Sequence, residues 1–511
     1  MPTAITKTAC ILGVDGHLVE VEADVSIGLG SFNIVGLPDS GIRESRDRIT
    51  ASLNNAAGGF PIRKVIVNLA PADLPKAGTG FDLPIACAIL EAAKKLPDRA
   101  SEGYLLVGEL SLDGRLRPVS GIVAIALAAR ERGITQMIVP QENAHSSHLV
   151  EGMEIFPAAS LSDVMGHLNQ SCCLAPFVPP VLAETGDSQY PALDFSEVKG
   201  QETAKRVMEI CAAGKHNVLF NGPPGSGKSM LAKRLPSILP VMEFDEMIEA
   251  TKIHGVAGTL KPGVDRLKQR PFQSPHHSVS NAGLIGGGSI PRPGEVSLAH
   301  HGVLFLDELP EYPRNVLDML RQPLEDRQIQ ISRAKSSLRF PTDFILVAAM
   351  NPCPCGFLGD TKKPCRCSAT QVEKYRSRIS GPLLDRIDLQ VEMPALSYDE
   401  LNFAAPGEPS SVIQGRVEQA RAWQHQRFEG RVTRYNANMS HQEVESFCPL
   451  NKEGHQLLKS ALETMGLSSR AHDSILKVAR TIADLGDSEQ IELSHLAEAV
   501  NYRSLEREVS Y

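Results

Sequence analysis

A glycine-rich segment at residues 221–229 has the residue types and spacing of a loop that holds nucleotide phosphates. Its letters, NGPPGSGKS, fit G-x-x-x-x-G-K-[ST] in every fixed position. An apolar run precedes it and a good helix start follows, which is the strand–loop–helix order that such a loop requires. A surface turn rich in glycine and proline is the alternative, and the context on both sides disfavours it. The residues predicted to contact the phosphates are Gly222, Pro223, Pro224, Gly225, Ser226, Gly227, Lys228 and Ser229, with Lys228 on the β- and γ-phosphates and Ser229 on Mg²⁺.

Two further apolar runs end in polar residues that suit the same chemistry. The run 303–306 is followed by Asp307 and Glu308, and the run 344–350 is followed by Asn351. Ligands of open α/β sheets bind at the carboxyl ends of the strands. We therefore expect Asp307 to hold the Mg²⁺ shell, Glu308 to activate the attacking water, and Asn351 to hydrogen-bond that water or the γ-phosphate. Taken singly, a solvated acidic turn and a loop-starting asparagine are the alternatives.

Two arginines stand in segments with a recognisable pattern. Arg386 lies between two aspartates in the run LLDRIDL at 383–389, and Arg470 lies near the start of a helix predicted to end at residue 485. From the residues alone, a structural salt bridge for Arg386 and an exposed arginine in a first helical turn for Arg470 both stay open.

Together, the phosphate-binding loop, the Asp-Glu pair, the Asn351 strand and the LLDRIDL run resemble the AAA+ ATPases, and more narrowly their magnesium-chelatase-like branch. The resemblance implies ATP and Mg²⁺ as cofactors. It also implies that Arg386 is an arginine finger, which enters the neighbouring subunit's site, and that Arg470 is the sensor-2 arginine of a helical lid. A finger supplied by a neighbour implies a ring, and a hexamer is usual in this class.

Residues 327–340 predict a β-hairpin, because apolar and polar residues alternate along both arms. The segment comes just before the Asn351 strand and resembles the pre-sensor-1 hairpin of the chelatase and replicative-helicase group, which projects into the pore of ring helicases. The resemblance implies that Arg333 and Lys335, near the tip, contact DNA phosphates without reading sequence. Basic residues at an exposed turn are the alternative.

The segment 270–288 resembles the helix-2 insert of the same group. It contains the adjacent pair His276 and His277, which could suggest a metal site. Adjacent residues of a regular element cannot easily share one ligand geometry, so a structural or loop role is expected for both.

Four of the ten cysteines fall in one short window, as two C-x-C pairs. Four thiolates can hold Zn²⁺ tetrahedrally, although C-x₂-C is the more typical spacing. Free or redox-active thiols are the alternative. The other cysteines are scattered, which suits a reducing compartment better than a disulfide framework. The candidate zinc ligands are Cys353, Cys355, Cys365 and Cys367.

The chain has 511 residues, which predicts two to four domains, and a net charge of −8. An acidic chain has no general nucleic-acid coat, so contact with DNA would use local basic patches. No apolar run approaches the about 20 residues that span a bilayer, and the first residues lack the layout of a signal peptide. We therefore expect a cytoplasmic protein with no membrane partner.

Patterns of hydrophobicity divide the chain into an α/β domain at 1–170, a linker at 171–193, an α/β P-loop core at 194–394 and a helical region at 395–511, which the resemblance implies is the lid. The linker is predicted from its prolines and its polar run. The predicted strands of the first domain are 18–25, 64–69 and 136–140, and its predicted buried helices are 83–90 and 121–129.

Residues 75–84 and 107–121 resemble two motifs of the Lon-protease-like fold, an α/β fold of the ribosomal S5 type. In active Lon domains these motifs carry a Ser nucleophile and a Lys base. Here Gly80 stands at the Ser position, and the Lys position falls near Val123. Without a nucleophile and a base, covalent peptide hydrolysis has no machinery, so we expect an inactive domain with a structural or DNA-engaging role.

The order of Lon-like domain, chelatase-type AAA+ core with a cysteine loop, and helical lid resembles the ComM/YifB family over nearly the whole chain. The resemblance implies a homo-hexameric, ATP-driven DNA motor for branch migration during natural transformation. Its implied partners are single-stranded and branched DNA and recombination proteins. A magnesium-chelatase ATPase subunit and a Lon-like ATP-dependent protease are the alternatives, disfavoured by the N-terminal domain and by the missing Ser/Lys pair respectively.

Overall fold

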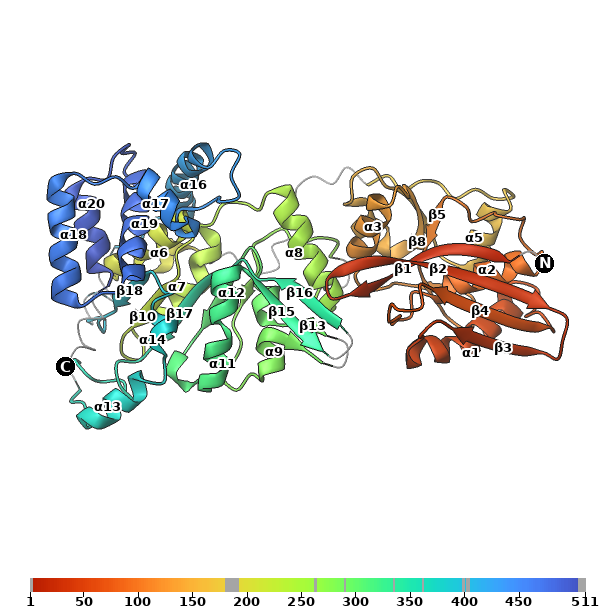
Figure 1. The fold of residues 1–511 in the computed structure, drawn as a ribbon, viewed down its shortest axis with the longest axis horizontal. Coiled ribbons are helices and arrows are strands. Elements are labelled where there is room, and N and C mark those ends of the chain that lie inside the picture. The colour runs from red at the N-terminus through yellow and green to blue at the C-terminus, as the bar shows by residue number, and fades with distance from the viewer. Residues whose placement is uncertain are drawn as a thin grey trace.

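The computed structural model describes residues 3–179, 193–261, 264–288, 291–333, 336–360, 363–397, 400 and 405–503. Figure 1 shows an elongated molecule with an α/β domain at the N-terminal end, a second α/β unit in the middle and a group of helices at the other end. This arrangement confirms the predicted fold class. Most of the linker predicted at 171–193 and the hairpin residue Lys335 lie outside the described residues.

The N-terminal domain is built on a seven-stranded sheet in the order β3-β4-β2-β1-β5-β8-β9. In β1, β5, β8 and β9, neighbouring residues enter different apolar clusters; in β1, Cys10 packs with helix α2 and Ala9 packs with helix α3. The sheet is therefore covered by helices on both faces. Its elements are β1 (Ala4–Leu12), β2 (Asp15–Ser26), β3 (Ser31–Val35), α1 (Ser40–Ala56), β4 (Lys64–Ala70), α2 (Asp82–Ala92), β5 (Tyr104–Leu106), β6 (Glu109–Leu110), β7 (Leu116–Arg117), α3 (Ile122–Glu131), β8 (Gln136–Pro140), α4 (Ala144–His148), β9 (Glu154–Ala158) and α5 (Leu161–Leu168).

The middle unit contains a five-stranded sheet in the order β11-β14-β17-β10-β18, in which all neighbouring strands are parallel. The three central strands are buried along their whole length, which explains their continuous apolar sequences. Their carboxyl ends meet at one edge. The elements are α6 (Glu202–Gly214), β10 (Val218–Asn221), α7 (Lys228–Arg234), α8 (Phe244–Ala257), β11 (Phe272–Gln273), α9 (Asn281–Ile285), β12 (Gly286–Gly287), β13 (Arg292–Pro293), α10 (Glu295–Leu298), β14 (Val303–Leu306), α11 (Arg314–Met319), α12 (Arg321–Asp326), β15 (Gln328–Arg333), β16 (Ser336–Pro341), β17 (Ile345–Met350), α13 (Ala369–Arg376), α14 (Gly381–Leu384) and β18 (Leu389–Glu392).

The C-terminal region is helical, as predicted. Its helices share one apolar core with α6 and with β10 and β18 of the sheet, so the lid is packed on the unit that carries the P-loop. The helices are α16 (Ser410–Arg427), α17 (His441–Phe447), α18 (Lys452–Met465), α19 (Ser469–Leu485) and α20 (Leu493–Asn501).

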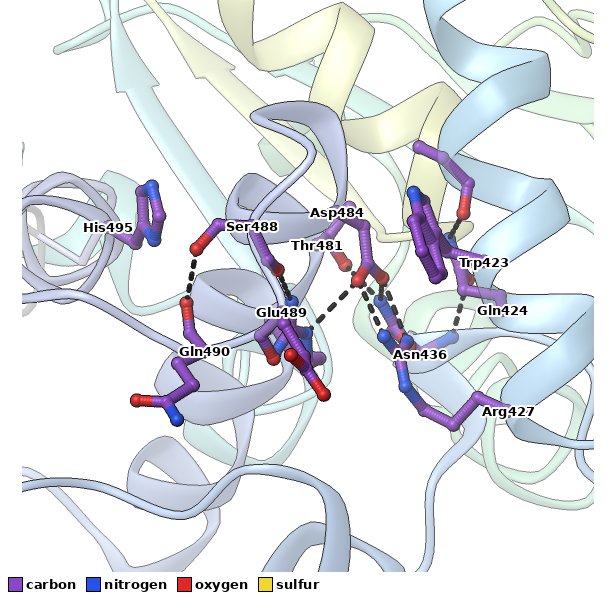
Figure 2. A network of polar contacts seen from close by, with 12 residues as sticks. Trp423, Gln424, Arg427, Asn436, Thr481, Asp484, Ser488, Glu489, Gln490 and His495 are labelled. Atoms are coloured by element: carbon purple, nitrogen blue, oxygen red, sulfur yellow. Dashed lines mark hydrogen bonds and ion pairs between the residues drawn. The ribbon is translucent and has the colours of Figure 1, made fainter.

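A buried carboxylate ties the lid helices together (Figure 2). The side chain of Asp484, only 1% exposed, accepts hydrogen bonds from Nη1 of Arg427 at 2.8 Å, Nε of Arg480 at 3.1 Å and Nδ2 of Asn436 at 2.7 Å. Both arginines are themselves largely buried. The carboxylate therefore compensates two cations that have little access to water.

Replacing Asp484 by Asn should lower the free energy of unfolding of the lid by about 3–5 kcal/mol, because two buried guanidinium groups lose their counter-charge. Urea unfolding can be followed by the fluorescence of Trp423, which is the chain's one tryptophan and donates Nε1–H to Asp487 at 2.8 Å. Glu489→Gln, an exposed acidic position in the same segment, should change stability by less than about 0.5 kcal/mol. Equal effects of the two substitutions would contradict the role of the buried carboxylate.

A helix and a hairpin both contribute to the packing of the N-terminal domain on the middle unit. Met247 and Ile248 of α8 lie in the same apolar cluster as α3. The turn between β1 and β2 reaches β16, since a Cβ on Gly13 would lie 3.7 Å from Cβ of Leu338. Contacts of both elements therefore join the domain to the unit that carries the P-loop.

Candidate active site

The phosphate-binding loop leaves the carboxyl end of β10 and returns into α7. Gly227 has a φ of 95°, a left-handed conformation that favours glycine, so the loop can turn sharply into the helix. Nζ of Lys228 lies 2.6 Å from the carbonyl oxygen of Gly222, 2.9 Å from that of Pro223, and 3.4 Å from Oδ1 of Asn351. The structure thus brings the predicted lysine and the predicted asparagine together at one sheet edge.

Burial lowers the pKa of Lys228 to about 8. A phosphate binds the ammonium form, so above pH 8 a protein without nucleotide must take up a proton when ATP binds. Affinity for ATP should be level below about pH 7 and should fall by up to about tenfold per pH unit above pH 8. Titration with a fluorescent ATP analogue between pH 6.5 and 9.5 measures this, and Lys228→Arg should flatten the profile. A level profile in the wild type would contradict the assignment of the titration to Lys228.

Ser229 and Asp307 offer adjacent oxygen ligands for a hard cation. The hydroxyl of Ser229 donates to Oδ2 of Asp307 at 2.6 Å, although the two residues are far apart in sequence. A hydroxyl and a carboxylate in contact beside the phosphate-binding loop are the donor types that Mg²⁺ takes together with phosphate oxygens. The residues present therefore fit Mg²⁺, which would neutralise charge on the phosphates when bound.

Glu308 is held in an uncommon backbone conformation, with a φ of 53°. Its amide donates to Oδ1 of Asp307 at 2.9 Å, and its carboxylate, about half exposed, lies 3.5 Å from Nδ1 of His277. Such strained positions cluster at functional sites. An exposed carboxylate beside the phosphate-binding loop can accept a proton from a water molecule.

His277 is a site residue that the sequence reasoning missed. A structural or loop role is the expectation for both histidines of the pair, and their rings lie against each other with centroids 4.0 Å apart and planes tilted by 35°. The contact of His277 with Glu308 adds a second role beside the acidic residue. Only the proximity of the segment to the Asp-Glu strand in the folded sheet produces this contact, because β11, which precedes the pair, runs alongside β14.

Arg386 lies at the opposite edge of the sheet from the phosphate-binding loop of its own chain. Its carbonyl oxygen accepts a hydrogen bond from Nδ2 of Asn217 at 3.0 Å, just before β10 begins. The loop begins at the other end of that strand, about five residues or roughly 16 Å away. An arginine side chain cannot cover this distance, so Arg386 cannot serve the nucleotide of its own chain in this conformation.

Arg470, the second residue of α19, meets Arg386 on one carboxylate. Nη2 of Arg470 donates to Oε1 of Glu325 at 2.8 Å, and Nη2 of Arg386 donates to Oε2 of the same residue. Arg386 and then Arg470 hold the pKa of Glu325 below its usual range. Two guanidinium groups that converge on one anion form an arrangement that also suits a phosphate. Glu325 lies in the short helix α12, and no local sequence motif predicts it as the partner of the two arginines.

Asp388, from the same run as Arg386, connects the two arginine segments. Its carboxylate accepts hydrogen bonds from Oγ of Ser474 on α19 at 2.7 Å and from the amide of Asn217 at 3.3 Å. The lid helix that carries Arg470 is therefore fixed to the sheet edge that carries Arg386.

The predicted hairpin is present as β15 and β16, with Ile329 opposite Phe340 and Ile331 opposite Leu338. These four residues are buried, so the hairpin packs one face on the core. Arg333 pairs with Ser336 at the end of the ladder. Arg339 is exposed on the second arm and adds a basic residue that was not among the predicted DNA contacts.

The four predicted zinc ligands lie together. Sγ of Cys353 is 3.3 Å from Sγ of Cys355 and 3.6 Å from Sγ of Cys365, and all four sulfurs lie within 4.8 Å of one another. The sulfurs are thiols without disulfide bonds. Hydrogen bonds from the backbone of Arg366 and Phe357 lower the pKa of Cys355 to about 6. The set has the number, type and closeness of ligands that Zn²⁺ requires.

Glu249, His300 and His301 form a second cluster of possible metal ligands, on α8 and before β14. Nδ1 of His300 accepts a hydrogen bond from the amide of Asp343 at 2.9 Å, so the neutral ring carries its proton on Nε2, which faces Glu249 at 3.1 Å. A protonated nitrogen cannot bind a metal. This cluster is a set of hydrogen bonds between histidines and a carboxylate.

The Lon-like positions hold no catalytic pair. A Cβ on Gly80 would lie 3.4 Å from Val107 and 3.5 Å from Val119, and Val123 is buried in α3. The surroundings of both positions are apolar.

Comparison with known proteins identifies the family. A sequence profile described as magnesium chelatase, subunit ChlI, matches residues 194–401, a profile of the C-terminal part of that subunit matches 407–503, and one described as subunit ChlI of Mg-chelatase matches 21–143. Competence protein ComM of Haemophilus influenzae is 44% identical over 510 residues, which cover 99% of this chain and 98% of that protein. The chain belongs to the ComM/YifB family. YifB of Salmonella typhimurium, another member, is 42% identical over 510 residues with the same coverage.

The ComM/YifB assignment confirms the predicted class, a magnesium-chelatase-like AAA+ ATPase with a Lon-protease-like N-terminal domain. Lon protease of Rhizobium meliloti is 26% identical over 166 residues, which cover 30% of this chain and 20% of that protein. ATP and Mg²⁺ are the cofactors that the AAA+ class implies. Among the described residues, no helix combines the length and apolar character needed to cross a membrane.

Proposed function

We propose that this chain is an ATP-driven DNA motor that assembles as a homo-hexamer and migrates DNA branches during natural transformation. The position of Arg386 carries the proposal. It lies with Arg470 at the sheet edge opposite to the phosphate-binding loop of its own chain. Complete active sites would then form only between neighbours, and a head-to-tail interface that closes gives a ring.

The roles of the site residues follow from this arrangement. Lys228 and Ser229 hold the phosphates and Mg²⁺ with Asp307, Glu308 activates water, and Asn351 orients the water or the γ-phosphate. Arg386 and Arg470 come from the neighbour. On assembly both arginines would leave the carboxylate of Glu325, and the negative charge of the γ-phosphate would take its place as their partner.

DNA as the substrate is supported by the hairpin and by a relative. One face of β15 and β16 is buried and leaves Arg339 exposed on the second arm, while Arg333 and Lys335 stand nearer the tip in sequence. The H. influenzae relative is a competence protein. The hairpin would bind DNA phosphates. The substrates would be single-stranded and branched DNA, and the protein would act with recombination proteins in the cytoplasm.

The cofactors of the proposed function are ATP and Mg²⁺, and we assign Zn²⁺ to the four-cysteine cluster. The N-terminal domain, proposed to span 1–170, would serve in assembly or in DNA contact without chemistry of its own. The apolar surroundings of Gly80 and Val123 support this role. The P-loop core and lid are proposed to span 194–394 and 395–511.

One assay separates this proposal from a chelatase-type ATPase subunit and from a Lon-like protease. The protein is incubated with ATP, Mg²⁺ and a branched DNA with one labelled strand, and strand release is followed on a native gel together with ATP hydrolysis. We expect DNA to stimulate hydrolysis and the labelled strand to be released. A rate of ATP hydrolysis that DNA does not change, together with no strand release, would contradict the proposal. Cleavage of a protein substrate would favour the protease.

A further inference from the structure

We propose that Zn²⁺ in the four-cysteine cluster controls the affinity of the nucleotide site, because the metal fixes a loop that forms one wall of that site. The inference rests on the proposed ATPase function and adds a regulatory metal to it. The cluster consists of Cys353, Cys355, Cys365 and Cys367.

The spacing of the sulfurs suits zinc. A tetrahedral site with bonds of about 2.3 Å places its sulfurs about 3.8 Å apart. The measured separations are 3.3 Å between Cys353 and Cys355 and 3.6 Å from Cys365 to each of them. Cys353 and Cys355 come from one end of the segment 353–367, and Cys365 and Cys367 come from the other end. A metal bound by all four would therefore join the two ends.

The first end of this segment continues directly from the active site. Asn351 contacts Lys228 through Oδ1 at 3.4 Å, and Cys353 follows two residues later with no exposed surface. The second end leads into α13 (Ala369–Arg376), whose Arg376 donates Nε–H to the carbonyl oxygen of Pro352 at 3.3 Å. Both ends of the cysteine segment therefore converge beside the asparagine of the nucleotide site.

Gly356 packs the segment directly on the phosphate-binding loop. A Cβ on Gly356 would lie 2.7 Å from Cδ and 3.0 Å from Cγ of Pro224, and 3.9 Å from Cγ of Asn351. The residue has a φ of 82°, and its amide donates to the carbonyl oxygen of Cys353 at 2.9 Å. The turn that presents two of the ligands is thus the same turn that touches the loop around the phosphates.

Loss of the metal should loosen this wall. The cluster has no disulfide bond, so a bound metal is what would join the two cysteine pairs. Without it, the first pair could move away from the second, and Gly356 would no longer support Pro224. The metal would act on nucleotide binding through packing, at a distance from the phosphates themselves.

The first experiment measures metal content and nucleotide affinity of the full chain without DNA. We expect about one Zn²⁺ per chain, an affinity for a fluorescent ATP analogue that falls about fivefold or more after chelation, and recovery after Zn²⁺ is returned. Cys172→Ser, which removes an exposed cysteine outside the cluster, should change neither quantity. A chain that binds no Zn²⁺ even when it is supplied, or one whose affinity ignores chelation, would overturn the inference.

The second experiment keeps all four cysteines and changes only the contact. Gly356→Ala should retain Zn²⁺ yet bind the ATP analogue about fivefold or more weakly, because its Cβ meets Pro224. Gly359→Ala is the matched control, since Gly359 has a similar φ of 79° and open space around its Cβ position. Equal affinities of the two variants would show that the contact does not couple the sites.

The outcome stays distinct from that of the DNA-motor proposal. Both measurements use nucleotide binding in the absence of DNA, whereas the motor is tested by strand release. A chain with zinc-dependent nucleotide affinity but no strand release would retain the inference and lose the motor. The reverse result would retain the motor and lose the inference.

Discussion

Glu308→Gln is expected to leave ATP binding within about threefold of the wild type and to lower turnover by about 10²–10⁴-fold. Gln has the shape of Glu but cannot take a proton from water. Other residues bind the nucleotide: Lys228 is assigned to the phosphates, and Ser229 with Asp307 is assigned to Mg²⁺. Steady-state phosphate release and titration with a fluorescent ATP analogue measure the two quantities separately.

Glu311→Gln is the matched control for this prediction. Glu311 lies three residues after Glu308, and its carboxylate pairs with Arg378 at 2.9 Å. This partially exposed pair should contribute little, so turnover should stay within about threefold of the wild type. A Glu308→Gln enzyme that kept more than about a tenth of wild-type turnover would rule out Glu308 as the base.

Arg386→Ala is expected to abolish turnover, by about 10³-fold or more, with ATP affinity nearly unchanged. The reason is the position of Arg386 at the opposite sheet edge, roughly 16 Å of strand from the loop that binds ATP in the same chain. We therefore expect binding to use one subunit and hydrolysis to need the arginine of the next. Phosphate release at a protein concentration that sustains assembly measures the loss, and Arg314→Ala, at a well-exposed surface arginine, is the control.

Mixing two inactive variants tests whether the arginine acts between subunits. Lys228→Ala lacks the phosphate contact, and Arg386→Ala lacks the finger. In rings mixed at random from equal amounts, about a quarter of the interfaces would join an intact loop to an intact arginine, so activity should return to about that fraction. No recovery in mixed rings would contradict the shared site. Subunits with different defects can complement each other only if the loop and the arginine of one active site come from different subunits.

Much of the active site could be predicted because its residues follow strands. Lys228, Asp307 and Asn351 each come after a short apolar run, and parallel strands bring such positions to one edge. The period-two pattern likewise predicted the hairpin, and the C-x-C spacing predicted the meeting of four sulfurs. These features depend on local sequence combined with one rule of sheet topology.

The remaining contacts depend on which elements meet in space. Glu325 stands in a short helix with no motif, and only the packing of the lid brings Arg470 to the same carboxylate as Arg386. His277 contacts Glu308 because β11 lies beside β14, which no pattern in the segment indicates. Side chains that meet across such distances are set by the whole fold, so propensity and spacing could not supply them.

The shared apolar core of α3 and α8 has a mechanical consequence. Helix α8 follows the helix of the phosphate-binding loop in sequence, and its Met247 and Ile248 are packed with the N-terminal domain. Domains joined by an apolar interface tend to move as one body. In a six-membered ring, the N-terminal domains would form a second ring beside the ring of P-loop units. Each conformational change at a nucleotide site would then also move the attached N-terminal domain, although that domain has no chemistry of its own.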